Sequence, residues 1–536
     1  MRFVAIIFLL LIVFTVVIAV QRALGKTEKE GSGADLIAYL MLALSMGVAG
    51  FALAALAQTA FPGDRFVFDP AESLATSLSA LVVSLPFVIY FWRRQAIRRV
   101  IYPQSAGWAL YLALIEMVFM TALVISAVSF IDGLIDDGSP SAWTGVLVFG
   151  AIVVFHEYSA RVTPPRSDAG ELQRVIGSAI GQVTLAIGLV GVLAALLAQG
   201  YEALGAPAPD LEFSPWVAML IVGAPLWAYR WLRPWPGEPG VPRASWTVLV
   251  ALGALAVGIG ATGFIGVLAI QYVFAETSPA GEHFEPLPIA LALMLAGVGV
   301  WAVHRRTLGT IRDNPLRTYE YGMAALGLIT AVSAAIALTL VAFDDSLIVG
   351  GALEEILAAA TVLVVGLAVW QTFAGRWRKG EPEFEVTAWP RRLYTLGLGI
   401  VFGLFAAGAL ITTLFVLLRR LLDEGSTASL LQPGTVLVYT GLAAWHLLAS
   451  YARDRGVTEA EDVVAPYQVT IICSHPGMIA TRFPKQASLR VIHRGDDVGA
   501  IDDEMADEIV AAVDDRSSLV WVDADGFRVA PMRTST

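Results

Sequence analysis

The sequence predicts an all-α polytopic membrane bundle of about 13 transmembrane helices, followed by a small C-terminal α+β soluble domain. Hydrophobic residues make up 57% of the 536 residues, charged residues make up only 15%, and the mean hydropathy is +0.70. Soluble domains contain roughly 45–50% apolar and about 25% charged residues. A folded surface in water needs more polar groups than this chain has, so the lipid bilayer must solvate most of it.

The predicted helices are apolar windows long enough to cross a hydrocarbon layer of roughly 30 Å. Pro86 and Pro225 inside two of them are tolerated in lipid, because neighbouring helices satisfy the freed carbonyl groups. The windows lie near residues 3–20, 35–57, 73–92, 107–130, 142–158, 174–198, 214–232, 245–273, 287–304, 318–342, 351–373, 391–418 and 431–449.

These windows divide the chain into three parts. We expect a membrane anchor with a cytoplasmic linker at residues 1–34, a membrane domain at 35–455 and an acidic cytoplasmic domain at 456–536. The first window could instead be a cleaved signal peptide, because Arg2 precedes an apolar run. The residues that follow it have no small-x-small cleavage pattern, and translocating them would put basic residues on the acidic side of the membrane. The sequence therefore favours an uncleaved anchor.

The basic residues lie almost entirely in alternate loops. The loops of one face, with the segment after the last window, carry 24 arginine and lysine residues, whereas the acidic loops of the other face carry four. Cytoplasmic loops are enriched in Lys and Arg, so we expect the N-terminus outside and the C-terminus in the cytoplasm. Only four of the 35 basic residues are lysine. This bias is typical of a GC-rich bacterial genome and predicts a bacterial inner membrane.

After the first window, the helices pair into hairpins that resemble one another. The second helix of each hairpin ends with an aromatic residue near arginines, and these aromatic residues recur every 63 to 75 residues. Interfacial anchoring explains each aromatic residue but not the spacing. We therefore predict six tandem parallel hairpin repeats, arranged either around an axis or as an irregular bundle. The expected interfacial anchors are Trp92, Trp227, Trp301, Trp370 and Trp445.

Two short segments resemble a known family. Residues 221–231 (IVGAPLWAYRW) resemble the second helix of a bacterial membrane family called domain of unknown function 5671, and residues 392–397 (RLYTLG) resemble the start of its first helix. The resemblance covers residues 35–455 as repeated helix pairs that end in a Gly-x-Pro-x-Trp…His-Trp element. Only Pro225 supplies the proline, and no unit has the His-Trp pair. The resemblance implies architecture and no activity, cofactor or catalytic residue.

Glu116 lies near the middle of a predicted span, and no other span has a carboxylate so deep. A central acidic group costs roughly 2.5–3.5 kcal/mol to insert, so it must face the bundle interior or a wet cavity. One hypothesis is an intramembrane proton or ion site. The other is a hydrogen-bonded residue that fixes one helix contact, which the sequence favours because it reveals no partner for the carboxylate.

We interpret the other polar residues near the spans as structural. We expect His156 and Glu157 to form an interfacial pair, and His304 and His446 to be anchors at the membrane rim. Gln182 and Gln271 are expected to bond across helices.

The sequence does not favour a catalytic or metal-dependent function. The six histidines show no metal-ligand spacing, and the single cysteine, Cys473, cannot form a thiolate cluster. No nucleotide-binding loop, nucleophile elbow or zinc-protease motif is present, and no basic arm favours nucleic-acid binding. We therefore expect no enzyme activity, no cofactor, no metal and no nucleic-acid partner.

The C-terminal segment has ordinary soluble composition. Residues 467–473 and 488–493 alternate as strands, and 502–515 has helical period with Asp502 as its N-cap. Residues 518–522 and 527–530 flank Asp525-Gly526, which predicts a hairpin. The order is β-β-α-β-β, with Cys473 buried in a strand.

These observations favour a membrane scaffold or assembly subunit, or a signalling subunit, with the bilayer and other membrane-protein subunits as partners. The alternative is a secondary transporter or channel that uses Glu116.

Overall fold

The computed structural model describes residues 33–60, 70–101, 106–136, 142–163, 167–232, 241–274, 279–309, 314–343, 352–376, 386, 388–422, 429–461, 468–474, 479–483, 488–494, 501–513, 518–523 and 525–531. The anchor predicted at 3–20 lies outside these residues. The chain divides into two compact units, Met1–Leu448 and Ala449–Thr536.

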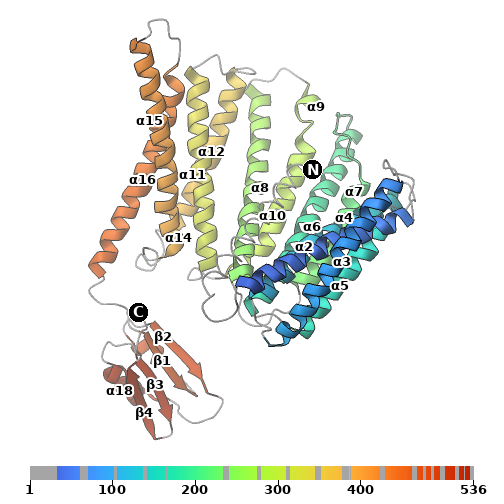
Figure 1. Cartoon of the computed structure of the whole chain (residues 1–536). Coiled ribbons are helices and arrows are strands. Elements are labelled where there is room, and N and C mark those ends of the chain that lie inside the picture. The colour runs from blue at the N-terminus through green and yellow to red at the C-terminus, as the bar shows by residue number, and fades with distance from the viewer. Residues whose placement is uncertain are drawn as a thin grey trace. The chain divides into compact units, whose positions relative to one another are not determined.

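The described part of the first unit is built from long helices (Figure 1). A short helix, α9 (Ala280–His283), precedes α10, and the first helix of the last hairpin begins with α14 (Trp389–Arg392) and a π-helical turn, η3 (Leu393–Gly397). The long helices are α2 (Gly33–Ala60), α3 (Pro70–Ile101), α4 (Ala106–Asp136), α5 (Trp143–Val162), α6 (Ser167–Ala203), α7 (Ser214–Trp231), α8 (Val241–Phe274), α10 (Leu287–Arg305), α11 (Asn314–Phe343), α12 (Ala352–Arg376), α15 (Leu398–Leu422) and α16 (Leu431–Glu461).

Ten helices in the described part of the chain are long and apolar enough to cross a membrane. They are α2 to α6, α8, α10, α11, α12 and the continuous segment Trp389–Leu422. The remaining long helices, α7 and α16, occupy two further predicted windows but are not among these ten. The prediction of a polytopic helical membrane protein is therefore confirmed, whereas the count of 13 stays a prediction.

Helices that follow one another in the chain pack side by side. The closest pairs are α2 with α3, α4 with α5, α6 with α7, α8 with α10, and α11 with α12. The first helix of each pair also packs against both helices of the next pair: α2 meets α4 and α5, α4 meets α6 and α7, α6 meets α8 and α10, and α8 meets α11 and α12. The hairpins thus follow one another in chain order as a row (Figure 1).

Three hairpins cross where glycines bring the two backbones into contact. A Cβ atom at Gly181 would lie 2.7 Å from the backbone nitrogen of Trp227, and a Cβ at Gly327 would lie 2.5 Å from that of Trp370. In the hairpin between them, a Cβ at Gly297 would lie 2.7 Å from the carbonyl oxygen of Ala254. Small residues permit such close approach in lipid, where packing drives helix association.

Aromatic residues fill the interior of the row. In the first hairpins of the row, Trp108, Tyr111 and Phe119 of α4 are fully buried. In the later hairpins, Tyr319 and Met323 of α11 are fully buried. Large apolar side chains on the outer surface, such as those of α3 and α15, are exposed. Exposure of this kind fits helices that lipid solvates.

The second unit contains a four-stranded sheet in the order β2-β1-β3-β4. The strands are β1 (Gln468–Cys473), β2 (Ser488–His493), β3 (Ser518–Asp523) and β4 (Gly526–Pro531). β1 pairs in parallel with β2 and β3, and β3 pairs antiparallel with β4. Gly526 has a φ of 125°, which only glycine adopts readily, so the predicted Asp-Gly hairpin is confirmed.

Helix α18 (Asp503–Val513) packs on the sheet and confirms the predicted helix. The backbone N–H of Met505 donates to the Asp502 carboxylate at 2.8 Å, which confirms the predicted N-cap. The sequence prediction missed α17 (Ile479–Arg482) between β1 and β2. Four residues are too few to show helical periodicity, yet a parallel pair needs a crossover connection at this place.

Candidate functional site

Glu116 lies in the interior of the row, and its side chain is 1% exposed. It comes from α4, whose other buried residues are apolar or aromatic. The guanidinium of Arg230, near the end of α7, forms an ion pair with the Glu116 carboxylate and is itself 5% exposed. The deep carboxylate therefore has a charged partner 114 residues away in the sequence.

Arg230 also binds a second carboxylate. Its Nη1 donates to Glu157 of α5 at 2.8 Å, while its Nη2 donates to Glu116. One guanidinium thus joins α4, α5 and α7, because its planar fork presents donors in two directions. Gln173 of α6 adds a longer bond of 3.4 Å to the other oxygen of Glu116. Four helices from two adjacent hairpins meet at this cluster.

The cluster continues to the surface through Arg161. Its guanidinium donates to the Tyr229 hydroxyl at 2.9 Å and lies 3.5 Å from Glu157. Glu157 is 24% exposed and Arg161 is 59% exposed, so polarity increases along a path from Glu116 outward. The two carboxylates and two guanidinium groups balance in formal charge. Solvent weakens the outer pair much more than the buried one.

Gly177 of α6 makes room for the buried ion pair. A Cβ atom there would lie 2.6 Å from Glu116 Oε1 and 3.0 Å from Arg230 Nε. The Nε atom of Arg230 is buried and has no hydrogen-bond partner among the described residues. The side chains of Glu116 and Arg230 therefore pack directly against the α6 backbone at Gly177, which encloses the buried end of the cluster.

Sequence reasoning missed the partner of Glu116. It counted Arg230 only as one of the basic residues of the cytoplasmic face, whereas the structure buries this residue in the last turn of α7. Its position immediately before Trp231, at the end of an apolar helix, resembles an interfacial anchor, so only the tertiary contact reveals its role. A buried ion pair of this kind holds helices at fixed positions, and removing one partner strands the other charge.

The histidines also differ from their expected roles. His156 is 1% exposed rather than interfacial, and its Nε2 lies 2.6 Å from the Tyr111 hydroxyl of α4. His304 is 2% exposed, so it is not an anchor at the rim. Both bond to the carbonyl four residues earlier through Nδ1, which leaves Nε2 as the acceptor.

His304 ends a hydrogen-bond chain across three helices. The indole N–H of Trp246 donates to Gln182 Oε1 at 3.1 Å, and the Gln182 amide N–H donates to His304 Nε2 at 3.0 Å. Because indole can only donate, this chain fixes both the amide orientation and the histidine tautomer. The expected cross-helix bonds of both glutamines are confirmed, since Gln271 donates to the carbonyl of Glu354 at 3.1 Å.

The predicted tryptophan anchors occupy several environments. Trp301 donates to the Tyr319 hydroxyl at 2.8 Å, and Trp370 donates to the Tyr394 hydroxyl at 3.0 Å, so each joins one hairpin to the next. Trp92 packs edge-on against His156, with ring centroids 6.0 Å apart. Trp227 packs beside the buried Trp231 and Trp246, while Trp445 is 75% exposed. The interfacial role of all five stays a prediction.

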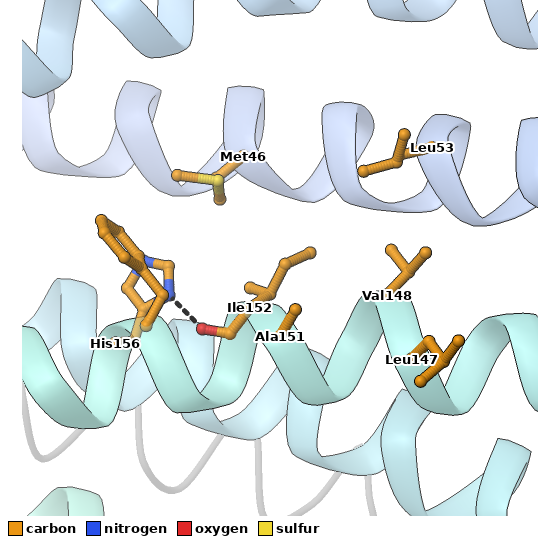
Figure 2. A pocket seen from close by; sticks show the side chains of 8 residues that line it. Met46, Leu53, Leu147, Val148, Ala151, Ile152 and His156 are labelled. Carbon is orange, nitrogen blue, oxygen red and sulfur yellow. Dashed lines mark hydrogen bonds between the residues drawn. The ribbon is translucent and has the colours of Figure 1, made fainter.

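Two apolar grooves open on the membrane unit. One of about 380 Å³ lies between α2 and α5, where Met46 and Leu53 face Leu147, Val148, Ala151, Ile152 and His156 (Figure 2). The other, of about 650 Å³, lies between α15 and α16 and is lined by Val401, Leu404, Phe405, Gly408, Ala409, Thr412, Gln432, Pro433 and Val436. Glu116 lines neither groove.

The C-terminal unit has a smaller polar cluster. Arg494, which follows β2, donates to the Asp523 carboxylate at 2.8 Å, and Trp521 donates to the same oxygen at 2.8 Å. These bonds hold the pKa of Asp523 below the ordinary value of an aspartate. Cys473 is buried in β1 as expected, and burial raises the pKa of its thiol, which disfavours the reactive thiolate.

The fold and the buried cluster define a multi-pass membrane protein. The family model described as domain of unknown function (DUF5671) matches residues 317–451, so the resemblance to that family is confirmed over this segment. The segment runs from the first turn of α11 into α16 and is shorter than the 35–455 that the resemblance covered. Neither the curated proteins nor the solved structures contain a match.

Proposed function

We propose that this chain is a scaffold or assembly subunit, or a signalling subunit, of the bacterial inner membrane, without catalytic activity. The observation that carries the proposal is the enclosure of Glu116. Arg230, Gln173 and the α6 backbone at Gly177 surround this carboxylate. A carboxylate that transports protons or ions must be accessible to those protons or ions. A carboxylate held in an ion pair between helices instead fixes the positions of the helices.

Polar contacts between adjacent hairpins support a rigid platform. The second and third hairpins meet at the Glu116–Arg230 ion pair, and the third and fourth meet at the Gln182–His304 bond. Trp301 with Tyr319, and Trp370 with Tyr394, join the later hairpins. Buried polar contacts of this kind specify which helix faces pack together.

The hairpins derive, in this proposal, from duplication of one two-helix unit. The close crossings support it, because Gly181, Ala254 and Gly327 occupy the same place in three consecutive hairpins. In each of them, the partner helix carries the Gly-x-x-x-Trp pattern. Such parallel units keep the same orientation in the membrane.

The proposed topology places the N-terminus outside and the C-terminus in the cytoplasm. Basic residues in the last turns of α5 and α10, and acidic residues in the first turn of α12, support it. The acidic C-terminal domain would then meet cytoplasmic partners. A fluorescent protein fused after Thr536 would mature if the C-terminus is cytoplasmic, whereas an alkaline phosphatase fusion would be inactive; the reverse pattern would overturn the topology.

One observation favours the alternative of a secondary transporter or channel. Two carboxylates, Glu116 and Glu157, share one guanidinium, and Glu157 continues to the exposed Arg161. If Glu116 accepted a proton, Arg230 could remain paired with Glu157. A carboxylate and arginine relay of this type would connect the interior of the bundle to one surface.

Two experiments separate these functions. Gentle detergent extraction of the native protein, followed by mass spectrometry of its complexes, is expected to find another membrane protein in constant stoichiometry. Reconstitution into liposomes with an internal pH dye and a panel of solutes is expected to show no proton-coupled flux. A flux that Glu116→Gln abolishes in a normally folded protein would refute the scaffold role and support transport.

A further inference from the structure

The two faces of the C-terminal sheet have different surroundings. Val469 and Ile471 of β1 and Val520 of β3 point into the apolar core that α18 covers. Both short helices of this module contribute to that same core, α17 through Ile479 and α18 through Ile509. Successive side chains of a strand point to opposite faces, so the residues between the core positions lie on the other face, which neither helix covers.

The strand register gathers apolar side chains into one row on this second face. Ile472 of β1 pairs with Ile492 of β2 on one side and with Trp521 of β3 on the other. Ile492 is 40% exposed and Trp521 is 41% exposed. Among the described residues from Gln468 to Pro531, these two are the large apolar side chains that are exposed. Their place in one row of a water-solvated module indicates a binding surface.

Arginines lie on the same face. Arg528 of β4 pairs with Trp521 and ends the row, Arg490 lies two positions before Ile492 on β2, and both arginines are exposed. The guanidinium of Arg494 lies over the Trp521 ring, 5.1 Å from its centroid. Asp523 neutralises Arg494 through an ion pair of 2.8 Å. Arg490 and Arg528 therefore give this face its net positive charge.

The acidic groups of the module gather on its other side. Helix α18 begins with the Asp502 cap, and its exposed residues include four further carboxylates: Asp503, Glu504, Asp507 and Glu508. Arg482 of α17 pairs with two of them, Asp503 and Asp507. The net acidity of the C-terminal segment is thus an average over an acidic helix side and a basic sheet face.

Covalent geometry keeps this module near the bilayer. Helix α16 has 31 residues and is therefore about 46 Å long, whereas the hydrocarbon layer is about 30 Å thick. The six residues 462–467 separate its end from Gln468, the first residue of β1, and can reach at most about 25 Å. A short tether of this kind holds the module at a high effective concentration of lipid headgroups.

We propose that the arginine–tryptophan face, formed by Ile472, Arg490, Ile492, Trp521 and Arg528, binds the headgroup layer of the bilayer and prefers anionic lipids. Tryptophan is suited to the membrane interface, because its ring is apolar and its indole N–H is polar. Guanidinium groups bind lipid phosphates with paired hydrogen bonds and attract anionic headgroups. The acidic side of α18 then faces away from the negative surface. This binding goes beyond the proposed function, since a scaffold and a transporter could both use it.

A fluorescent dye on the full chain tests the proposal. In a Cys473→Ala background, Ile492→Cys carries an NBD dye, and the protein is placed in nanodiscs of phosphatidylcholine with or without phosphatidylglycerol. The dye emission is expected to shift to the blue only in the anionic nanodiscs, and high salt should weaken this response. Glu508→Cys on α18 is the matched control position and should not respond. A nitroxide on the lipid headgroups should quench the dye at 492 and not at 508.

Arginine variants test whether charge carries the binding. Arg490→Gln and Arg528→Gln are each expected to lower the ratio of bound to free module about fivefold, and both together about 30-fold. Arg482→Gln removes the same charge from the α18 side of the module and should leave the ratio unchanged. Hydrogen exchange of the β1 amides checks that the sheet stays folded in each variant.

Three results would overturn the proposal: an equal response in both lipid compositions, an equal response at both dye positions, or binding that the double arginine variant leaves intact. A dye at 492 that ignores phosphatidylglycerol but responds to added RNA or to an acidic protein would assign the face to that partner instead, and would also overturn the lipid proposal.

Discussion

Arg230 of α7 forms a buried ion pair with Glu116 of α4, although 114 residues separate them in the sequence. The same guanidinium holds Glu157 of α5 at 2.8 Å. The second and third hairpins are therefore joined by one cation between two carboxylates. This relationship explains why a chain that is otherwise apolar keeps charged groups inside its helical bundle.

Removing either partner of the ion pair should destabilise the protein. Glu116→Leu leaves Arg230 without its buried partner, and Arg230→Met leaves Glu116 uncompensated; each change is expected to cost about 3–5 kcal/mol of unfolding free energy. The double variant should recover part of this loss, because the two fully buried charges are gone and Glu157, which is 24% exposed, keeps Arg161 as its partner. Stepwise unfolding in mixed detergent micelles would measure the cycle, and additive effects would contradict a direct pair.

Gly177 should not tolerate a side chain. Gly177→Ala places a methyl group 2.6 Å from Glu116 Oε1 and is expected to lower the unfolding midpoint by displacing the ion pair. Gly200→Ala in the same helix is the control: no atom lies within 4 Å of its Cβ position, so better helix propensity should stabilise it by up to about 1 kcal/mol. Equal responses from the two variants would rule out a special role for Gly177.

The hydrogen-bond chain through Gln182 should behave as one unit. Gln182→Leu removes the acceptor of the Trp246 indole and the donor to His304, and it is expected to cost about 1–3 kcal/mol. In the Gln182→Leu background, Trp246→Phe should cost much less unfolding free energy than the same change in the wild type. The reason is that the acceptor of the Trp246 indole is already gone. Nitrogen NMR of labelled histidine should find the proton of His304 on Nδ1 in the wild type. A proton on Nε2 would contradict the chain.

The pKa of Asp523 should be lower than that of an ordinary aspartate, because Arg494 and Trp521 donate to its carboxylate. A pKa that is lower in the folded state stabilises the C-terminal unit above the unfolded pKa, and this contribution is lost as the pH falls through the folded value. Carboxyl-carbon NMR of the full chain, with Asp523→Asn for assignment, would measure it. Arg494→Gln should raise the pKa of Asp523 towards that of an ordinary aspartate, and an unchanged pKa would argue against the bond.

Local patterns along the chain were sufficient to identify the membrane helices and the C-terminal strands. Long apolar windows predict helices because an unpaired backbone cannot lie in hydrocarbon. A helix satisfies its own backbone groups, so the prediction does not depend on which helices pack beside it. Alternation at 488–493 and Asp-Gly at 525–526 work in the same way. The short helix α17 escaped because four residues carry too little periodicity.

The tertiary structure alone decided which polar residues meet. The sequence by itself identified Glu116 as exceptional, and its cost in a bilayer required an interior position. It could not reveal Arg230, because an arginine at a helix end has the same local pattern whether it reaches the headgroups or turns inward to a carboxylate on another hairpin. Contacts between distant segments depend on how helix faces pack, and that information is absent from any single window of the chain.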